Sequence, residues 1–338
     1  MYSTLNVDSK IKNYSVEFVS DIDGILDLIA NPNVITFIDS NVVKLYPKLN
    51  LLNIVSVECI ENTKNLEGTH LIYSTLVEKK ANINTKLVVI GGGILQDLVG
   101  FCASTYCRGI DYILIPTTLL AQVDSCVGGK TSLNFKNKKN TLGTFYPPTK
   151  IIIYPEFTKT LSNLDLISGF GEIYKFHILQ DNIENFDIRS NLTQMIYDGL
   201  KFKIDILSRD EFDKGERKYL NFGHTFGHAL ETTSLYEIPH GVAVSIGCMI
   251  AILLSKELGY SVNNFEKVLK DGIELIRSSN IKFKEEWFDF NNLCCIIKSD
   301  KKSTGKLTMV LINNKPFLRD IEEYDLLCTI LRKTYEII

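Results

Sequence analysis

The chain has 338 residues, of which 45% are hydrophobic and 23% charged, and its formal net charge at pH 7 is −3. That length allows two domains with separate cores, and the composition is that of an ordinary soluble protein. The slightly acidic balance, without a long basic block, argues against a nucleic-acid partner. Apolar runs of membrane-spanning length and an N-terminal signal pattern are both missing. The eight cysteines then indicate reduced thiols, so we expect a cytoplasmic protein.

The first half of the chain alternates strand-like and helix-like segments. Strands are expected at 33–39, 52–60, 86–90, 111–115 and 150–154, and a helix at 66–80. Continuous apolar strands separated by helices predict a parallel sheet that is covered on both faces. Ligands of such sheets bind at the carboxyl ends of the strands.

From about residue 161 onward, apolar residues recur mostly at helical spacing. Helices are expected at 161–179, 184–207, 216–232, 242–258 and 265–278, and a lone strand at 306–312. Gly259 fits the end of a helix. We therefore predict a Rossmann-like α/β domain over residues 1–158 and a mainly α-helical domain over residues 159–338. A cleft between two such domains is the expected ligand site.

Three of the five histidines lie between positions 224 and 240. If the segment around the first two is helical, its polar residues share one stripe, because they are spaced i, i+4, i+7 and i+11. These residues are Arg217, Asn221, His224 and His228. A stripe with a cation, an amide and two imidazoles is a poor core face and is typical of an active-site wall. A solvated helix face is the plain alternative.

Glu172 offers a carboxylate oxygen to a metal ion. Two imidazoles and one carboxylate form a set that recurs in catalytic zinc sites. Spacing alone selects His224 and His228 as the imidazoles, because histidines at i and i+4 of a helix chelate well. Lys175 lies one helical turn after Glu172, so an ordinary ion pair is the alternative for these two residues.

Two glycine-containing segments could approach a phosphate. Gly91–Gly93 follow an expected strand and open a helix, which suits an anion, although a tight turn explains them equally well. Gly128–Thr131 looks like the end of a P-loop, but Asp124 occupies the position of its leading glycine, which disfavours a nucleotide triphosphatase. The nearby polar residues could hold a phosphate or sugar hydroxyls, or could lie solvated at the surface. They are Asp124, Lys130, Lys139 and Asn140.

Seven motifs follow one another along the chain in a characteristic order. They are Gly91–Asp97, Tyr106–Gly109, Pro116–Ser125, Val127–Thr131, Gly171–Lys175, Asn221–Ala229 and Pro239–Gly241. Together they resemble the 3-dehydroquinate synthase family of sugar-phosphate cyclases, over nearly the whole chain from about residue 58 to 312. The third and sixth motifs are the most specific. The resemblance implies bound NAD, a catalytic zinc or cobalt ion and a homodimer.

The resemblance also implies roles for individual residues. The implied metal ligands are Glu172, His224 and His240, so that His228 would face the substrate phosphate. The implied substrate contacts are Arg108, Asp124, Lys130, Asn140, Lys175, Lys203, Arg217, Asn221, His228 and one of Lys301 and Lys302, of which we favour Lys302. The implied NAD contacts are Asp39, Asn41, Glu61, Lys64, Gly91, Gly92, Gly93, Asp97, Thr117, Thr118, Lys130, Lys139 and Thr160. Arg108 would reach the site of the neighbouring subunit.

The implied reaction converts 3-deoxy-arabino-heptulosonate 7-phosphate to 3-dehydroquinate and phosphate, in the shikimate pathway to aromatic amino acids. Its steps are transient oxidation by NAD, elimination of phosphate, re-reduction and intramolecular aldol closure. The alternatives are a sibling cyclase that acts on another ketose or heptulose phosphate, and a metal-dependent polyol dehydrogenase. The chain retains the family's residues that contact the substrate carboxylate and phosphate, which favours the carboxylated heptulosonate. They are Lys203, Arg217, Asn221 and His228.

Four departures from the family pattern involve five positions. Gln96 replaces a small residue of the glycine-rich turn, Cys59-Ile60 replace an Asp-Gly pair, and Asp213 replaces a glutamate. Val242 replaces a glutamate that usually follows His240-Gly241. Loss of a carboxylate behind a metal ligand is expected to lower metal affinity or activity by about 10- to 100-fold. A catalytically inactive binding protein is therefore a further alternative.

Overall fold

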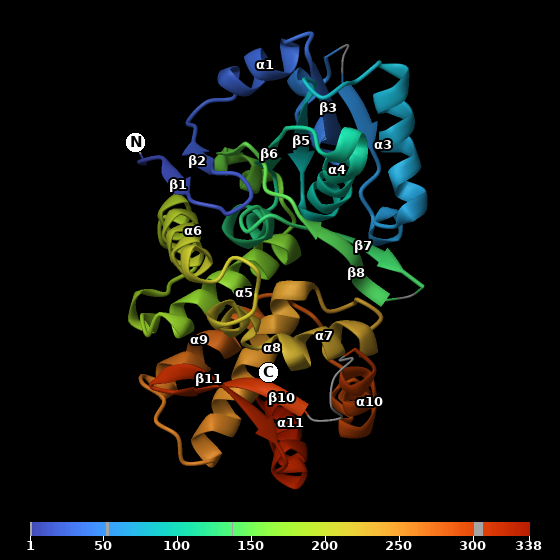
Figure 1. Ribbon diagram of the computed structural model, residues 1–338. Helices are drawn as coiled ribbons and strands as arrows, with labels where there is room; N and C mark the ends of the chain where they lie inside the picture. The colour runs from blue at the N-terminus through green and yellow to red at the C-terminus, as the bar shows by residue number, and fades with distance from the viewer. Residues whose placement is uncertain (1, 52–53, 137, 301–306) are drawn as a thin grey trace. The chain divides into compact units, whose positions relative to one another are not determined.

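The computed structural model describes residues 2–51, 54–136, 138–300 and 307–338 (Figure 1). The chain divides into two compact units. Unit 1 comprises residues 1–161 and 196–212, and unit 2 comprises residues 162–195 and 213–338. The expected single boundary after residue 158 stays a prediction.

Unit 1 is built on a seven-stranded sheet with the order β1-β2-β9-β6-β5-β3-β4. Its strands are β1 (Leu5–Val7), β2 (Tyr14–Phe18), β3 (Val34–Asp39), β4 (Ile54–Val57), β5 (Lys86–Gly91), β6 (Tyr112–Pro116) and β9 (Lys150–Ile153). Only β1 and β2 pair antiparallel; the other neighbours pair in parallel. The predicted parallel sheet is therefore confirmed, and the short antiparallel edge is an addition to it.

Helices cover this sheet because its central strands are apolar along their whole length. Leu87 to Ile90 of β5 are fully buried, so both faces of that strand must be covered. The helices of unit 1 are α1 (Asp23–Ala30), α2 (Ser40–Leu45), α3 (Leu66–Glu78) and α4 (Gly93–Thr105). Helix α4 packs against β5, β6 and an unexpected antiparallel hairpin, β7 (Lys130–Phe135) with β8 (Lys138–Phe145).

Unit 2 is mainly helical, as predicted. Its helices are α5 (Asn163–Leu179), α7 (His224–Thr233), α8 (His240–Glu257), α9 (Phe265–Arg277), α10 (Phe290–Asp300) and α11 (Tyr324–Ile337), and α6 (Leu192–Arg209) leads from unit 2 into unit 1. Helix α8 is the centre of the unit, since it packs against α5, α7, α9, α11 and β10 (Leu307–Asn313). By length and mean hydropathy (1.4) α8 alone among the described helices could cross a membrane, which the sequence analysis did not anticipate; 83% of it is buried, as in a core helix.

Three expectations for the second half are wrong in detail. The helix expected from residue 184 begins only at Leu192, because Asn191 caps it by accepting a hydrogen bond from the Gln194 N–H (3.2 Å). The strand expected to be alone, β10, pairs with β11 (Lys315–Ile321) through a turn at Asn314, whose φ is +55°. Asparagine tolerates that left-handed conformation, and hairpin turns require it.

The third error concerns the histidine segment. Residues 216–232 do not form one helix: a short 3₁₀ helix (Glu216–Asn221) ends before α7 begins at His224. Gly223 separates the two with φ = +78°, a conformation that glycine adopts without strain. A β-carbon there would also lie 2.6 Å from the Val244 carbonyl oxygen of α8. The predicted single stripe is therefore broken between Asn221 and His224.

Candidate active site

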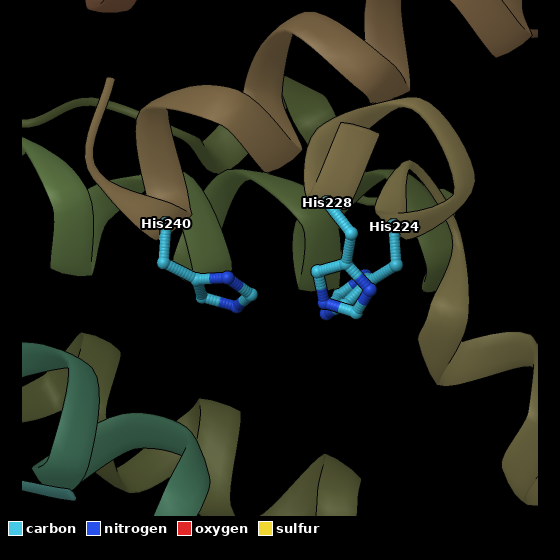
Figure 2. A group of neighbouring side chains, drawn as sticks. All are labelled: His224, His228 and His240. Carbon is cyan, nitrogen blue, oxygen red and sulfur yellow. The ribbon is translucent and has the colours of Figure 1, made fainter. Parts of the chain in front are cut away.

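Three helices of unit 2 bring a carboxylate and three imidazoles together. Glu172 comes from the middle of α5, His224 and His228 from α7, and His240 is the first residue of α8. Figure 2 shows the three imidazole rings projecting from α7 and α8 toward one another. The nitrogen atoms that could bind a metal ion lie within 4.8 Å of one another.

Glycines let α5 and α8 approach closely enough to place Glu172 beside His240. A β-carbon on Gly171 would lie 2.0 Å from the Gly241 carbonyl oxygen, and one on Gly241 would lie 1.7 Å from the Ser168 carbonyl oxygen. The Ser168 hydroxyl also accepts a hydrogen bond from the Gly241 N–H (3.0 Å). Only glycine fits at these two positions, so the two backbones touch next to Glu172 and His240.

The donor atoms of Glu172, His224 and His240 converge. Oε1 of Glu172 lies 3.3 Å from Nε2 of His240 and 3.7 Å from Nε2 of His224. Nδ1 of His224 lies 3.1 Å from the Phe222 carbonyl oxygen, which can only accept, so this nitrogen carries the proton and Nε2 is left as the donor to a metal. Nδ1 of His240 lies 3.0 Å from Oε2 of Glu231.

The charges around this centre set the protonation of its members. Burial disfavours the Glu172 carboxylate, but the buried Lys175 ammonium and the two imidazoles outweigh it and hold its pKa well below the ordinary range. Burial, reinforced by Lys175, lowers the pKa of His224 well below its usual value, so His224 is neutral. Burial opposes protonation of His240 as well, yet Glu172 and Glu231 raise its pKa to about 10. A metal ion would displace that proton.

This arrangement fits a divalent metal ion. Zinc bonds of about 2.0–2.1 Å in tetrahedral geometry separate neighbouring donors by about 3.3–3.4 Å, and the observed separations are 3.3 and 3.7 Å. The Glu172 carboxylate is fully buried: Oε2 is paired with the Lys175 ammonium, and Oε1 faces the Nε2 atoms of His224 and His240, where a cation could bind between them. The ligand atom of His228 also lies within 4.8 Å of those of His224 and His240, so the geometry is compatible with either choice of the second imidazole.

The other candidate residues of unit 2 surround this centre to different degrees. Lys175 is buried and forms an ion pair with Glu172. His228 is exposed, and its ring lies 5.2 Å from that of His224 and 5.6 Å from that of His240. Arg217 is buried and Asn221 is exposed, both on the 3₁₀ helix. Lys301 and Lys302 lie outside the described residues.

In unit 1, Lys203 and Asp124 form a nearly buried ion pair. Nζ of Lys203 lies 2.9 Å from Oδ1 of Asp124 and donates to the Asp124 carbonyl oxygen at 2.6 Å. Asp124 belongs to a π-helical turn (Ala121–Ser125) that follows β6. Such turns are frequent at functional sites because they reorient side chains within a helix.

A second polar network in unit 1 joins Lys64, Asp97 and Asn140. Nζ of Lys64 lies 2.5 Å from Oδ2 of Asp97 and donates to Oδ1 of Asn140 at 2.7 Å. The Ser132 hydroxyl joins the same network, 3.0 Å from Asp97 and 2.8 Å from Asn140. Burial raises the pKa of Asp97, although Lys64 opposes that shift.

Sequence reasoning missed Ser132 and Asn134 of β7. The side-chain amide of Asn134 donates to Oε1 of Glu61 (2.7 Å), and its Oδ1 accepts from the Asn140 N–H (3.0 Å). Both residues lie on β7, whose pairing with β8 is irregular between Leu133 and Phe135. A recognised hairpin at residues 130–145 would have pointed to them.

The proposed NAD contacts gather around the carboxyl ends of adjacent strands. Asp39 ends β3 and caps α2 by accepting from the Asn41 N–H (2.8 Å); Gly91 ends β5, and its carbonyl accepts from the Thr117 N–H (3.2 Å) after β6. This edge is where ligands of parallel sheets bind. The N-terminus of α4, which opens at Gly93, suits a phosphate there.

Four further candidates lie in unit 1. Lys139 lies 3.9 Å from Glu61, and the Thr160 hydroxyl lies 3.3 Å from that of Tyr46. Lys130 is exposed at the start of β7, and Arg108 is exposed with φ = +65°.

A small cavity lies within unit 1 between the glycine turn and β7. Its lining includes Gly93, Gln96, Asp97, Ser125, Gly129 and Lys130. The unusual Gln96 is buried there and bridges two segments, since it donates to the Gly91 carbonyl (3.2 Å) and accepts from the Ser125 hydroxyl (3.4 Å).

The fold is that of the sugar-phosphate cyclases. The structure of 2-deoxy-scyllo-inosose synthase complexed with carbaglucose-6-phosphate, NAD⁺ and Co²⁺ matches with a TM-score of 0.84 at 21% identity, over 98% of this chain and 100% of that chain. A second match is the structure of 2-epi-5-epi-valiolone synthase from Streptomyces hygroscopicus subsp. jinggangensis 5008 with NAD⁺ and Zn²⁺ bound. Its TM-score is 0.79 at 22% identity, and the match covers 99% of each chain.

Sequence comparison narrows this class. Residues 54–168 match the family model of the 3-dehydroquinate synthase N-terminal part, and residues 169–303 match that of the C-terminal part. The 3-dehydroquinate synthase of Alkaliphilus metalliredigens is 38% identical over 275 residues, which cover 77% of this chain and 76% of that protein. The chain belongs to the 3-dehydroquinate synthase family.

Proposed function

We propose that this protein is a 3-dehydroquinate synthase that converts 3-deoxy-arabino-heptulosonate 7-phosphate to 3-dehydroquinate and phosphate. The reaction makes it a carbon–oxygen lyase that depends on NAD and on Zn²⁺ or Co²⁺. The convergence of Glu172, His224 and His240 in unit 2 is the observation that carries the proposal, because a metal ion held there would leave a position open for a substrate oxygen.

Neighbouring groups keep the proposed metal ligands in the protonation states that metal binding requires. Lys175 keeps Glu172 ionised, and the Phe222 carbonyl holds His224 in the tautomer whose Nε2 can bind the metal. A bound zinc ion would act as a Lewis acid that polarises the substrate oxygen at the carbon to be oxidised.

The proposed NAD site lies in unit 1, at the carboxyl ends of β3, β5 and β6. Asp39, with Asn41 beside it, would meet a ribose, and the turn at Gly91–Gly93 would leave room for the pyrophosphate. Thr117 and Thr118 border this turn: a β-carbon on Gly92 would lie 3.1 Å from the Thr118 methyl group. NAD would take a hydride from the substrate and return it later, so it would be regenerated in each turnover.

The proposed substrate contacts are mostly cations and amides, as the substrate carries a phosphate and a carboxylate. In unit 1 they are Arg108, Asp124, Lys130, Asn140 and Lys203, and in unit 2 they are Lys175, Arg217, Asn221, His228 and Lys302. Elimination of phosphate becomes easier when such groups stabilise the departing anion. His228 is suited to this role because its exposed imidazole lies beside the proposed metal ligands.

We also propose a homodimer, in which Arg108 reaches the neighbouring subunit's site, and a cytoplasmic location. Exposure of Arg108 is compatible with the first proposal. The eight free cysteines are compatible with the second, since a reducing compartment keeps thiols reduced.

A substrate comparison tests the proposal. Purified protein with NAD⁺ and Zn²⁺ would be given the carboxylated heptulosonate phosphate, a heptulose 7-phosphate without the carboxylate, or glycerol. We expect phosphate release from the first substrate at a kcat/KM at least 100-fold above that for the second, and no reduction of NAD⁺ by glycerol. Preference for the uncarboxylated sugar would point to a sibling cyclase, and NADH formed from glycerol would point to a polyol dehydrogenase.

A further inference from the structure

Glu231 is a buried carboxylate beside the proposed metal centre to which the sequence patterns assigned no role. It lies in the last turn of α7, and its side chain is 9% exposed. Its Oε2 lies 3.0 Å from Nδ1 of His240, on the side of the imidazole ring opposite the nitrogen that faces Glu172. An ionised carboxylate can only accept, so Nδ1 of His240 donates this hydrogen bond.

We propose that Glu231 is a positioning residue that holds the His240 imidazole in the tautomer and orientation that direct Nε2 toward the metal ion. The inference rests on the proposed metal site at Glu172, His224 and His240. Histidines that bind metals usually donate their second ring N–H to a carboxylate or carbonyl, which fixes the ring and makes the other nitrogen a stronger donor.

The two histidine ligands are held differently. His224 donates to the Phe222 backbone carbonyl, whereas His240 donates to a charged side chain. The net charge of the site gives a physical reason for this difference. The charges of Glu172 and Lys175 cancel, so a bound divalent ion would leave a net charge of +2 without Glu231 and of +1 with it. Buried uncompensated charge is costly, so Glu231 favours occupancy by a cation.

The connection between α7 and α8 keeps Glu231 and His240 in register. Glu231 follows His224 and His228 at i+7 and i+3, so all three lie on the face of α7 toward the start of α8. Ser234, in the connecting turn, donates to the Glu231 carbonyl oxygen (3.2 Å) and accepts from the Ile238 N–H (3.2 Å). The Ser234 side chain therefore links the end of α7 to the residues that precede α8.

Glu231 also bears on the departure at Val242. A missing carboxylate at that position was expected to weaken the centre, but Val242 is 1% exposed in the first turn of α8. The carboxylate next to His240 comes from α7 instead. His240 therefore keeps one charged partner, although position 242 is a valine.

The test compares zinc affinity among variants of the full chain. Glu231→Ala removes the acceptor, Glu231→Gln keeps a neutral oxygen that can still accept from Nδ1, and Glu257→Gln is the control. Glu257 is half-exposed in the same unit and lies 3.9 Å from Lys333. Dissociation constants would be measured by competition with a chromophoric chelator, and the visible spectrum of the cobalt-loaded protein would report ligand geometry.

We expect Glu231→Ala to weaken zinc binding by about 10- to 100-fold and to change the cobalt spectrum. Glu231→Gln should fall between Glu231→Ala and the wild type, and Glu257→Gln should match the wild type. Thermal melting of the metal-free proteins separates these effects from misfolding; if Glu231→Ala does not fold, Glu231→Gln decides.

Two outcomes would overturn different claims. If wild-type protein binds zinc tightly and folded Glu231 variants bind it within about twofold of the wild type, the positioning role is wrong while the proposed function stands. If wild-type protein itself binds no zinc, the proposed metal site is wrong, and the role of Glu231 falls with it.

Discussion

At the scale of single residues, burial distinguishes the candidate ion pair of Lys203 and Asp124 from ion pairs on the surface. Lys203 has only 7% of its side chain exposed and is paired with Asp124, whereas Lys150 and Glu17 form a pair in the same unit with 38% and 36% exposed. Breaking a buried pair leaves an uncompensated charge behind, while exposed pairs contribute little.

We therefore predict that Lys203→Met lowers the free energy of unfolding by about 2–4 kcal/mol. This loss is smaller than that expected for a fully buried ion pair, because Asp124 is partly exposed. The matched change Lys150→Met should alter it by less than about 1 kcal/mol. Urea unfolding followed by circular dichroism measures both. Equal effects of the two substitutions would show that burial of the Lys203–Asp124 pair does not matter.

Buried thiols give a prediction about pH. Burial raises the pKa of Cys102 and that of Cys126 to about 12. Unfolded thiols ionise near about pH 8.5, so above that pH the unfolded chain binds fewer protons than the folded one. The free energy of unfolding then falls as pH rises toward 12, by up to about 1.4 kcal/mol per pH unit for each thiol.

Urea unfolding at pH 8 and pH 10 measures this slope. Replacement of Cys126 by alanine should make the slope shallower, because one of the shifted groups is gone. Replacement of the exposed Cys107 should leave the slope unchanged. The explanation fails if the Cys126 variant keeps the full pH dependence.

At the scale of helices and strands, the elements with a strong apolar pattern were predictable and those fixed by tertiary contacts were not. The expected strand at 86–90 is β5 (Lys86–Gly91), and the expected helix at 265–278 is α9 (Phe265–Arg277). The hairpin of β7 and β8 was missed, because β8 is mostly polar and carries no apolar alternation.

The break before α7 has a different cause. Apolar spacing runs through Gly223 without interruption, so periodicity predicts one helix. The structure places Gly223 against α8, where its φ of +78° and the nearby Val244 carbonyl exclude a continuous helix. A sequence pattern carries no information about that contact.

The contact between α5 and α8 makes a prediction at this scale. Gly241→Ala should separate the two helices, because its β-carbon would lie 1.7 Å from the Ser168 carbonyl oxygen. We expect a loss of about 1–3 kcal/mol in the free energy of unfolding and weaker zinc binding, since Glu172 and His240 move apart.

Gly24→Ala in α1 is the control, because an added β-carbon there meets nothing within 4 Å. It should leave the free energy of unfolding unchanged or raise it by about 0.5–1 kcal/mol. Chemical denaturation and chelator competition measure the two variants side by side. A Gly241→Ala protein as stable as Gly24→Ala would contradict the close helix contact.

At the scale of the whole molecule, the sequence predicted which kinds of side chain form the site better than it predicted which individual residues do so. Two imidazoles and a carboxylate were expected from the residues alone, and helical spacing selected His224 and His228 as the imidazoles. His240 belongs to another helix, and only the packing of α7 on α8 shows that its Nε2 lies 3.3 Å from Glu172. The family resemblance selected His240 in place of His228 as a metal ligand, and that choice stays a prediction.

For Glu231, the sequence contained a signal that was not recognised. The interval of seven residues from His224 placed it on the same face of a helix, so the signal was present in the sequence. Its significance emerges only from the 3.0 Å contact with His240. Contacts between helices therefore account for most of what sequence reasoning could not supply.

We propose that this protein oxidises one substrate, eliminates phosphate from it and reduces it again, with a metal ion held by Glu172, His224 and His240. The most direct test follows phosphate, 3-dehydroquinate and NADH together in one reaction of 3-deoxy-arabino-heptulosonate 7-phosphate with NAD⁺ and Zn²⁺. We predict equal amounts of phosphate and 3-dehydroquinate without accumulation of NADH, and loss of all turnover in a folded His240→Ala protein. Wild-type protein that binds zinc and NAD⁺ yet releases no phosphate would contradict the account.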